Sequence, residues 1–151
     1  MYMDHRIQAA ELFISGYNCA QAVAVAYCDV TGLEPKFAAK MASSFGGGMG
    51  RLREVCGAVS GMFMVAGLLY GYDGPDDGEC KKAHYHLVQD LAAQFKEQAG
   101  SIVCREILKN PPSDPNPTPR TAEFYKVRPC TRMVMLACEI LDRYIENHPI
   151  A

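Results

Sequence analysis

One stretch of the chain, residues 56–72, contains no charged side chain, and it is long enough to form several helical turns. Its length approaches that of a membrane-spanning helix. However, Gly57, Gly61 and Gly67, the polar Ser60 and the lack of a second apolar span all favour a helix buried in protein. A helix that is apolar on every side needs partners on every side. The sequence therefore predicts an all-α, single-domain multi-helix bundle with a buried glycine-containing central helix.

Helical periodicity and capping residues predict the elements that would surround this helix. Asp4 and Asn18 are N-cap residues, and Gly32 and Gly100 are typical of helix C-termini. Pro35 suits the first turn of a helix. We expect Ser101 to cap a short helix that ends at Leu108. The expected helices cover residues 4–14, 18–31, 35–44, 56–72, 76–100, 101–108 and 129–147.

Residues 111–119 hold five of the nine prolines and cannot form a helix or an inner strand. We expect a loop that crosses the surface, and we expect residues 124–127 to form a short extended piece. The helix after this loop cannot build a core alone, so it should dock on the others. Residues 1–151 are thus predicted to form one domain.

Composition excludes several function classes. The formal net charge is -2, so no basic excess indicates nucleic acid or an anionic membrane as a partner. Residues 1–6 lack the apolar core of a signal peptide, and we expect a cytoplasmic protein with no membrane span. Seven cysteines in a reducing compartment indicate free thiols, redox switching or metal binding rather than a disulfide framework.

Four of the cysteines, Cys19, Cys56, Cys104 and Cys130, stand where a helix is expected to begin. Unpaired N–H groups and the helix dipole stabilise a thiolate at that position, which is the nucleophilic and metal-binding form. A single buried cysteine is more often a packing residue. Because all four share the same placement, we predict that they converge on one site.

The other three cysteines are expected to lie outside that site. Cys28 falls on the face of its helix opposite Cys19, and Cys138 is too far along its helix from Cys130 to share a small site. Cys80 lies between charged neighbours in an exposed first turn, where adventitious oxidation is the expected chemistry.

The motifs around these cysteines resemble a known family. Residues 16–22 (GYNCAQA), 45–51 (FGGGMGR) and 56–61 (CGAVSG), followed by Cys104 and Cys130, are similar to the C_GCAxxG_C_C family of redox-active proteins. The resemblance spans nearly the whole chain. It implies a four-cysteine redox protein, often associated with transporter genes, with an unidentified redox partner or transporter-linked protein as its partner.

The glycine run, residues 46–50, can be interpreted in two ways. It lacks the Gly-Lys-Ser/Thr of a P-loop and follows no predicted strand, which argues against a phosphate site. We interpret Gly46, Gly47, Gly48 and Gly50 as cofactor-binding residues, where backbone can approach a sulfur or a ligand closely. Arg51 and Arg53 could compensate thiolate charge, and they make Cys56 the thiol expected to react first.

Two mechanisms fit the four cysteines. They could act as two dithiol pairs, in which a thiolate attacks a disulfide or peroxide and a neighbouring cysteine resolves the product. Alternatively, the same four thiolates could bind an iron-sulfur cluster or a single metal ion for electron transfer. A third hypothesis is a non-enzymatic, transporter-associated binding or redox-sensor module. The sequence leaves homo-oligomerisation and enzymatic turnover open.

Overall fold

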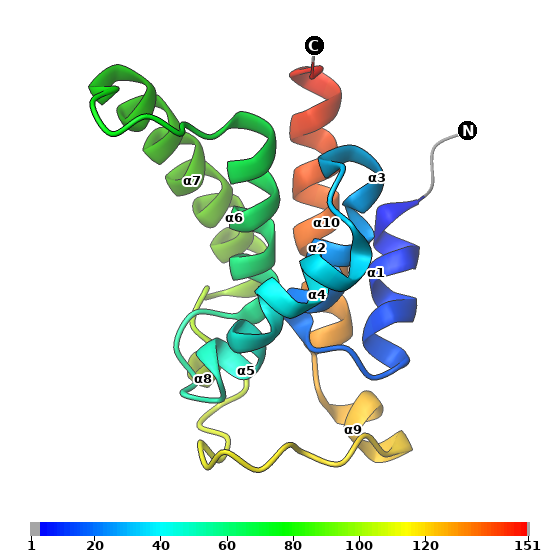
Figure 1. Ribbon diagram of the computed structural model, residues 1–151. Helices are drawn as coiled ribbons and strands as arrows, with labels where there is room; N and C mark the ends of the chain where they lie inside the picture. The colour runs from blue at the N-terminus through cyan, green and yellow to red at the C-terminus, as the bar shows by residue number, and fades with distance from the viewer. Residues whose placement is uncertain (1–3, 151) are drawn as a thin grey trace.

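The structure is a computed structural model that describes residues 4–150, and regular structure in that range is helical (Figure 1). This confirms the predicted all-α fold. The helices are α1 (His5–Ile14), α2 (Cys19–Ala26), α3 (Cys28–Thr31), α4 (Pro35–Ala42), the 3-10 helix η1 (Ser43–Phe45), α5 (Gly46–Met49), α6 (Gly57–Tyr70), α7 (Gly78–Ala99), α8 (Cys104–Ile107), α9 (Ala122–Val127) and α10 (Cys130–Asn147).

Most helix ends follow from local chemistry. The Asp4 side chain accepts hydrogen bonds from the first turn of α1, and Asn18 forms a reciprocal capping box with Gln21 at the start of α2. Gly32 and Gly100 end α3 and α7 in the left-handed conformation that glycine adopts without strain. These ends agree with the sequence prediction.

Helix α6 packs against α2, α7 and α10, and much of its surface is buried. Two glycines on α6 allow α2 to approach closely. A Cβ atom at Gly61 would lie 2.9 Å from the Ala20 carbonyl oxygen, and one at Gly57 would lie 3.1 Å from Cys19 Cβ. The start of α2 is therefore held against the start of α6. Within residues 4–150, no helix is long and apolar enough to cross a membrane.

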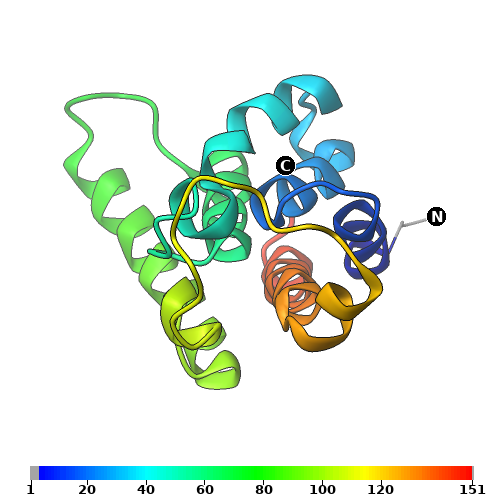
Figure 2. The same cartoon turned by 90° about the horizontal axis from the view of Figure 1, so that it is seen from below.

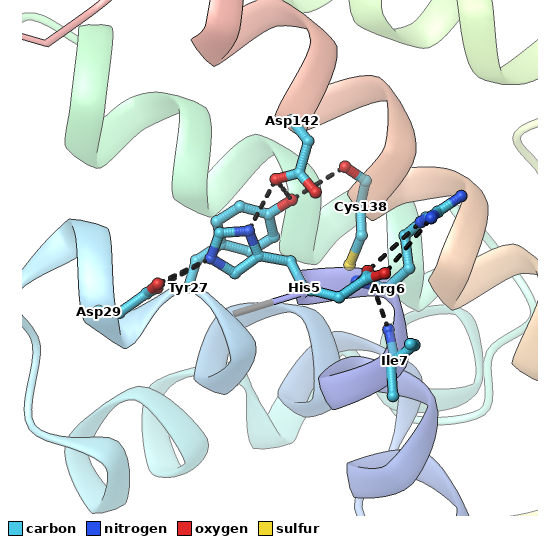
Figure 3. Close-up of polar contacts among 8 residues, drawn as sticks. His5, Arg6, Ile7, Tyr27, Asp29, Cys138 and Asp142 are labelled. Carbon is cyan, nitrogen blue, oxygen red and sulfur yellow. Dashed lines mark hydrogen bonds and ion pairs between the residues drawn. The ribbon is translucent and has the colours of Figure 1, made fainter. Parts of the chain in front are cut away.

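A polar cluster joins α1, α10 and the segment around α3 (Figure 3). His5 Nδ1 lies 2.8 Å from Asp142, and its Nε2 lies 2.9 Å from Asp29. The ring of His5 stacks on Tyr27, whose hydroxyl donates to Asp142 and to the Cys138 carbonyl oxygen. We call this group the His5 cluster.

Several helices begin at the end of the molecule opposite the His5 cluster. Helices α6 and α10 both begin at the end that points down in Figure 1, and α5 and α8 lie below the start of α6. Residues 109–121, the yellow segment, cross this end in both views (Figure 2). The expectation of a surface loop in the proline-rich stretch is correct, because residues 111–119 form no regular structure and are largely exposed.

Three local predictions were wrong. The helix expected to run from Asn18 to Thr31 breaks at Tyr27, whose backbone leaves the helical region. Ser101 caps no helix, because its hydroxyl instead accepts from Val103 N–H and faces Glu106, so α8 begins only at Cys104. Residues 124–127 are helical in α9, which Thr121 caps through the Phe124 N–H.

Candidate functional site

The structure brings Cys19, Cys56, Cys104 and Cys130 together around one small cavity. Its volume of about 30 Å³ holds no more than a few atoms. We call it the four-thiol cavity. Its other lining residues are Gly47, Gly48, Arg53, Gly57, Ile107, Leu108 and Met133.

Each of the four cysteines stands at a helix start, as the sequence predicts. Cys19, Cys104 and Cys130 are the first residues of α2, α8 and α10. Cys56 is the N-cap residue of α6, where the backbone N–H groups of Ala58 and Val59 favour its thiolate. The four sulfurs thus come from four helices that are far apart in the sequence.

Cys56 and Cys104 are aligned by an isolated antiparallel bridge between Val55 and Val103. Cys56 N–H donates to the Ile102 carbonyl at 2.7 Å, and Cys104 N–H donates to the Glu54 carbonyl at 2.6 Å. Since side chains alternate across extended backbone, the two thiols, each one residue past the bridge, face the same side. Sequence reasoning missed this bridge, because a single residue pair leaves no period-two pattern.

The glycine run forms a tight turn rather than a regular helix. Gly47, Gly48 and Gly50 have positive φ angles, which glycine adopts without strain. A Cβ atom at Gly48 would lie 2.6 Å from Cys104 Cβ, so only glycine lets the turn approach this cysteine. Of the four glycines predicted to bind a cofactor, Gly47 and Gly48 line the cavity, whereas Gly46 packs against Asn18.

The two arginines after the glycine run take different roles. Arg53 is only 4% exposed, lines the cavity and places Nη1 3.7 Å from Cys104 Sγ. Its Nε donates to the Pro112 carbonyl at 2.9 Å. Arg51 instead donates to the Asp114 carbonyl and the Thr118 hydroxyl. Both arginines therefore anchor the proline-rich loop, but only Arg53 faces the thiols.

The electrostatics single out Cys130. A hydrogen bond from Cys19 lowers the pKa of the Cys130 thiol to about 7, although burial opposes this. The positive charges of Arg128, Arg120 and Arg53 lower the pKa further. Cys130 is also partly exposed, whereas Cys19, Cys56 and Cys104 are buried. Cys130 thus combines an acidic thiol with access from solvent.

The partner thiols are shifted in the opposite direction. Donating to Cys130 raises the pKa of Cys19, and burial raises it further. Burial raises the pKa of Cys56 to about 12, although the backbone N–H groups of Ala58 and Val59 at its helix start act to lower it. Burial also raises the pKa of Cys104, which the hydrogen bond from Arg53 partly offsets. The expectation that Cys56 is the most reactive thiol is therefore not supported, because desolvation outweighs the helix start.

Two arginines that act on Cys130 escaped the sequence interpretation. Arg128 lies two residues before Cys130, which was a usable signal. Arg120 comes from the loop before α9, and its guanidinium lies 4.4 Å from the centre of the Phe13 ring. It donates to the Phe13 and Tyr17 carbonyls, which fixes its place beside α1. No local sequence pattern predicts that tertiary contact.

The remaining cysteines lie outside the cavity lining. Cys138 is buried in the core, where burial and the Asp142 carboxylate raise its pKa. Cys28 is partly exposed on α3, and its sulfur faces the Ala24 carbonyl. Cys80 is exposed on α7, and its interaction with Asp77 raises its pKa. Cys138 and Cys80 lie where the sequence predicts. Cys28 also lies outside the cavity lining, but it is on the separate helix α3 and not on the far face of the helix that carries Cys19.

All four cysteines are also the predicted ligands of a metal centre. Among residues 4–150, no three His, Cys, Asp or Glu side chains are arranged to bind a metal ion. A four-thiolate site places every sulfur about 2.3 Å from the metal. The four cysteines as they stand therefore do not have the arrangement of a single-ion site.

Comparison with known protein families gives a match that covers most of the chain. The family described as "Putative redox-active protein (C_GCAxxG_C_C)" matches residues 17–144, a range that contains all four cysteines of the cavity. No curated protein and no solved structure matches the chain.

Proposed function

The chain belongs to the C_GCAxxG_C_C family of redox-active proteins, and on this premise we propose that it carries out thiol–disulfide exchange with Cys130 as the attacking thiol. The observation that carries the proposal is the placement of Cys130 and Cys19 at two helix starts around one cavity, where their interaction shifts the two pKa values in opposite directions. One member is acidic and partly exposed, and the other is buried and protonated. This is the asymmetry that an attacking and a resolving thiol require.

The first step uses the Cys130 thiolate as the nucleophile. Its sulfur attacks one sulfur of a substrate disulfide, the substrate S–S bond breaks, and one substrate thiolate leaves. A mixed disulfide with Cys130 remains. A pKa of about 7 gives a substantial thiolate fraction at neutral pH and keeps the sulfur nucleophilic.

Cys19 completes the reaction. Once Cys130 is in a mixed disulfide, it no longer holds the negative charge that Cys19 stabilises by donating a hydrogen bond. Cys19 then loses its proton to solvent or to the departing thiolate and attacks Cys130, which releases the second substrate thiol. Two electrons pass from the Cys19–Cys130 pair to the substrate. An external dithiol restores the reduced pair by the reverse exchange.

We assign Cys56 and Cys104 to a second dithiol pair. The bridge between Val55 and Val103 holds both on one side of the chain, and both line the same cavity as the first pair. Exchange between the pairs would move the disulfide from Cys19–Cys130 into the buried half of the cavity. Arg53 supports this step because it stabilises negative charge on Cys104.

The test is a stoichiometric oxidation of anaerobically purified, reduced protein. One equivalent of 2-hydroxyethyl disulfide is added, and the disulfides are mapped by mass spectrometry, with iron and zinc measured on the same sample. We expect a Cys19–Cys130 disulfide first and a Cys56–Cys104 disulfide with further oxidant. A stoichiometric metal that protects all four thiols would contradict the proposal, as would inert thiols, which would favour a binding or sensor module.

A further inference from the structure

A larger groove adjoins the four-thiol cavity. It has a volume of about 540 Å³, which lies within the range of pockets that hold small molecules. The end of α7, the segment after α8 and the start of α10 form its walls. We call it the basic groove. Its lining residues are Gln98, Ala99, Ile107, Leu108, Lys109, Val127, Arg128, Pro129, Arg132 and Met133.

The charged residues that line the basic groove are all positive. Lys109, Arg128 and Arg132 line it, and among the residues that the structure describes no lining residue is acidic. None of the three forms an ion pair with a carboxylate of residues 4–150. The whole chain, in contrast, has a formal net charge of -2. A local cluster of three cations on an acidic protein favours an anionic ligand.

The backbone at the rim of the basic groove has an unusual conformation at Lys109. Lys109 has a φ angle of 58°, a conformation that non-glycine residues rarely adopt. The hydrogen bond from Asn110 N–H to the Arg105 carbonyl, at 2.7 Å, helps to hold this turn. Strained backbone persists where the surrounding structure enforces it, and such positions cluster at functional sites.

The basic groove and the four-thiol cavity share a wall. Ile107, Leu108 and Met133 line both spaces, and Arg128 and Pro129 in the groove directly precede Cys130. A methionine side chain is flexible and adapts to a ligand. The basic groove is therefore separated from the cavity that Cys130 lines only by this shared wall.

We infer that the basic groove binds a small disulfide that carries carboxylates and presents its sulfur–sulfur bond to Cys130. This inference rests on the proposed function and names its substrate class. The Cys130 thiolate attacks one substrate sulfur, one carboxylate-bearing thiolate leaves, and Cys19 then releases the second. Two thiols are oxidised and one substrate disulfide is reduced, so atoms and electrons balance. The cations orient the substrate and stabilise the charge of the leaving thiolate.

The experiment compares three disulfides of similar size and different charge. These are dithiodipropionate (anionic), 2-hydroxyethyl disulfide (neutral) and cystamine (cationic). The rate of Cys19–Cys130 disulfide formation is measured at one pH and low salt. We expect the anionic compound to react about tenfold or more faster than the neutral one, and cystamine to react slowest. Added salt should reduce the difference.

Variants test whether the preference for the anionic disulfide arises in the basic groove. The double variant Lys109→Gln and Arg132→Gln should bring the anionic-to-neutral rate ratio close to one. Lys36→Gln, an exposed lysine on α4, is the charge control and should leave the ratio unchanged. Arg128 is left intact because it also lowers the pKa of Cys130.

The outcomes separate this inference from the proposed function. If all three disulfides oxidise the pair at equal rates, or if Lys36→Gln changes the ratio as much as the double variant, the basic groove is not the binding site and the proposed function stands. If none of the three forms a Cys19–Cys130 disulfide, the proposed function fails, and the inference fails with it.

Discussion

Helix α10 carries two cysteines in opposite surroundings. Cys130, at its start, lies among three arginines and accepts a hydrogen bond from Cys19, which lowers its pKa to about 7. Cys138, further along the helix, is buried beside Asp142 in the His5 cluster, which raises its pKa (Figure 3). Residue type and helix are the same, so burial, neighbouring charges and hydrogen bonds decide whether a thiol is reactive.

The two regions also differ in what holds them together. The four-thiol cavity depends on close backbone approach at Gly48 and Gly57 and on an arginine-anchored loop. The His5 cluster depends on one aromatic stack and hydrogen bonds between His5, Tyr27 and two carboxylates. One region therefore tolerates no added side-chain volume, and the other is sensitive to the charge of a single imidazole.

The largest expected effect comes from removing the two α10 cysteines in turn. Cys130→Ser should lower the rate of disulfide formation by about 100-fold or more, because the attacking thiolate is lost. The rate of disulfide formation in Cys138→Ala should stay within about twofold of that in the unmodified chain, since the Cys138 thiol lies outside the cavity. Stopped-flow oxidation with 2-hydroxyethyl disulfide measures both rates, and circular dichroism checks that each variant is folded. An equal loss of oxidation rate in the two variants would contradict the expected difference between Cys130 and Cys138.

A glycine pair tests the packing of the cavity. Gly48→Ala should lower the free energy of unfolding by about 2–4 kcal/mol, because the new Cβ would overlap Cys104 Cβ and adjacent backbone at a positive φ angle. Gly32→Ala, near the His5 cluster, has a similar φ angle and nothing within 4 Å, so only about 1 kcal/mol is expected. Urea denaturation compares them, and equal losses would show that Cys104 does not constrain the turn.

The pH dependence of stability should have opposite signs in the two regions. The lowered pKa of Cys130 stabilises the fold when the thiol is ionised, fully above its ordinary value of 9.0, and this contribution is lost as the pH falls through about 7. The free energy of unfolding of the unmodified chain minus that of Cys130→Ser should therefore rise by about 1–3 kcal/mol between pH 6 and 9. A flat difference would mean that Cys130 has an ordinary pKa.

The smallest expected effect lies in the His5 cluster. Burial disfavours the charged imidazole, but hydrogen bonds to Asp142 and Asp29 outweigh it and raise the pKa of His5. The resulting stability is fully present below the ordinary value of 6.5 and is lost as the pH rises through the raised pKa. The difference between the unmodified chain and His5→Gln should thus fall by about 1 kcal/mol over that rise. Denaturation at matched pH values measures it, and a rising difference would contradict the assignment.

Much of this fold could be predicted locally. Asp4, Asn18, Pro35 and Gly100 act within a few residues of their own position, and the helix ends they define are where the sequence places them. The helix starts in turn placed the four cysteines correctly. Ser101 shows the limit of such arguments, because a capping residue also forms turns, and only the bridge at Val103 decides between them.

The ranking of the thiols could not be predicted in the same way. The sequence argument favoured Cys56, because a helix start and two arginines lie next to it in the chain. In the structure, Arg51 turns to the proline-rich loop, Arg53 faces Cys104, and burial dominates at Cys56. Cys130 gains its acidity from Cys19 and Arg120, which are distant in sequence. Desolvation and long-range charge are properties of the folded chain alone.

The central claim is that Cys130 is the acidic thiol of this protein, and timed alkylation tests it most directly. Reduced, metal-free protein is treated with iodoacetamide from pH 5 to 10, and each cysteine is followed by mass spectrometry. The exposed Cys80, whose pKa is raised, is the internal control for access. We predict that Cys130 is labelled first at pH 7, with a half-maximal rate near that pH, ahead of Cys80 and Cys56. Labelling of Cys80 or Cys56 before Cys130, or a Cys130 midpoint at pH 9 or above, would contradict the account.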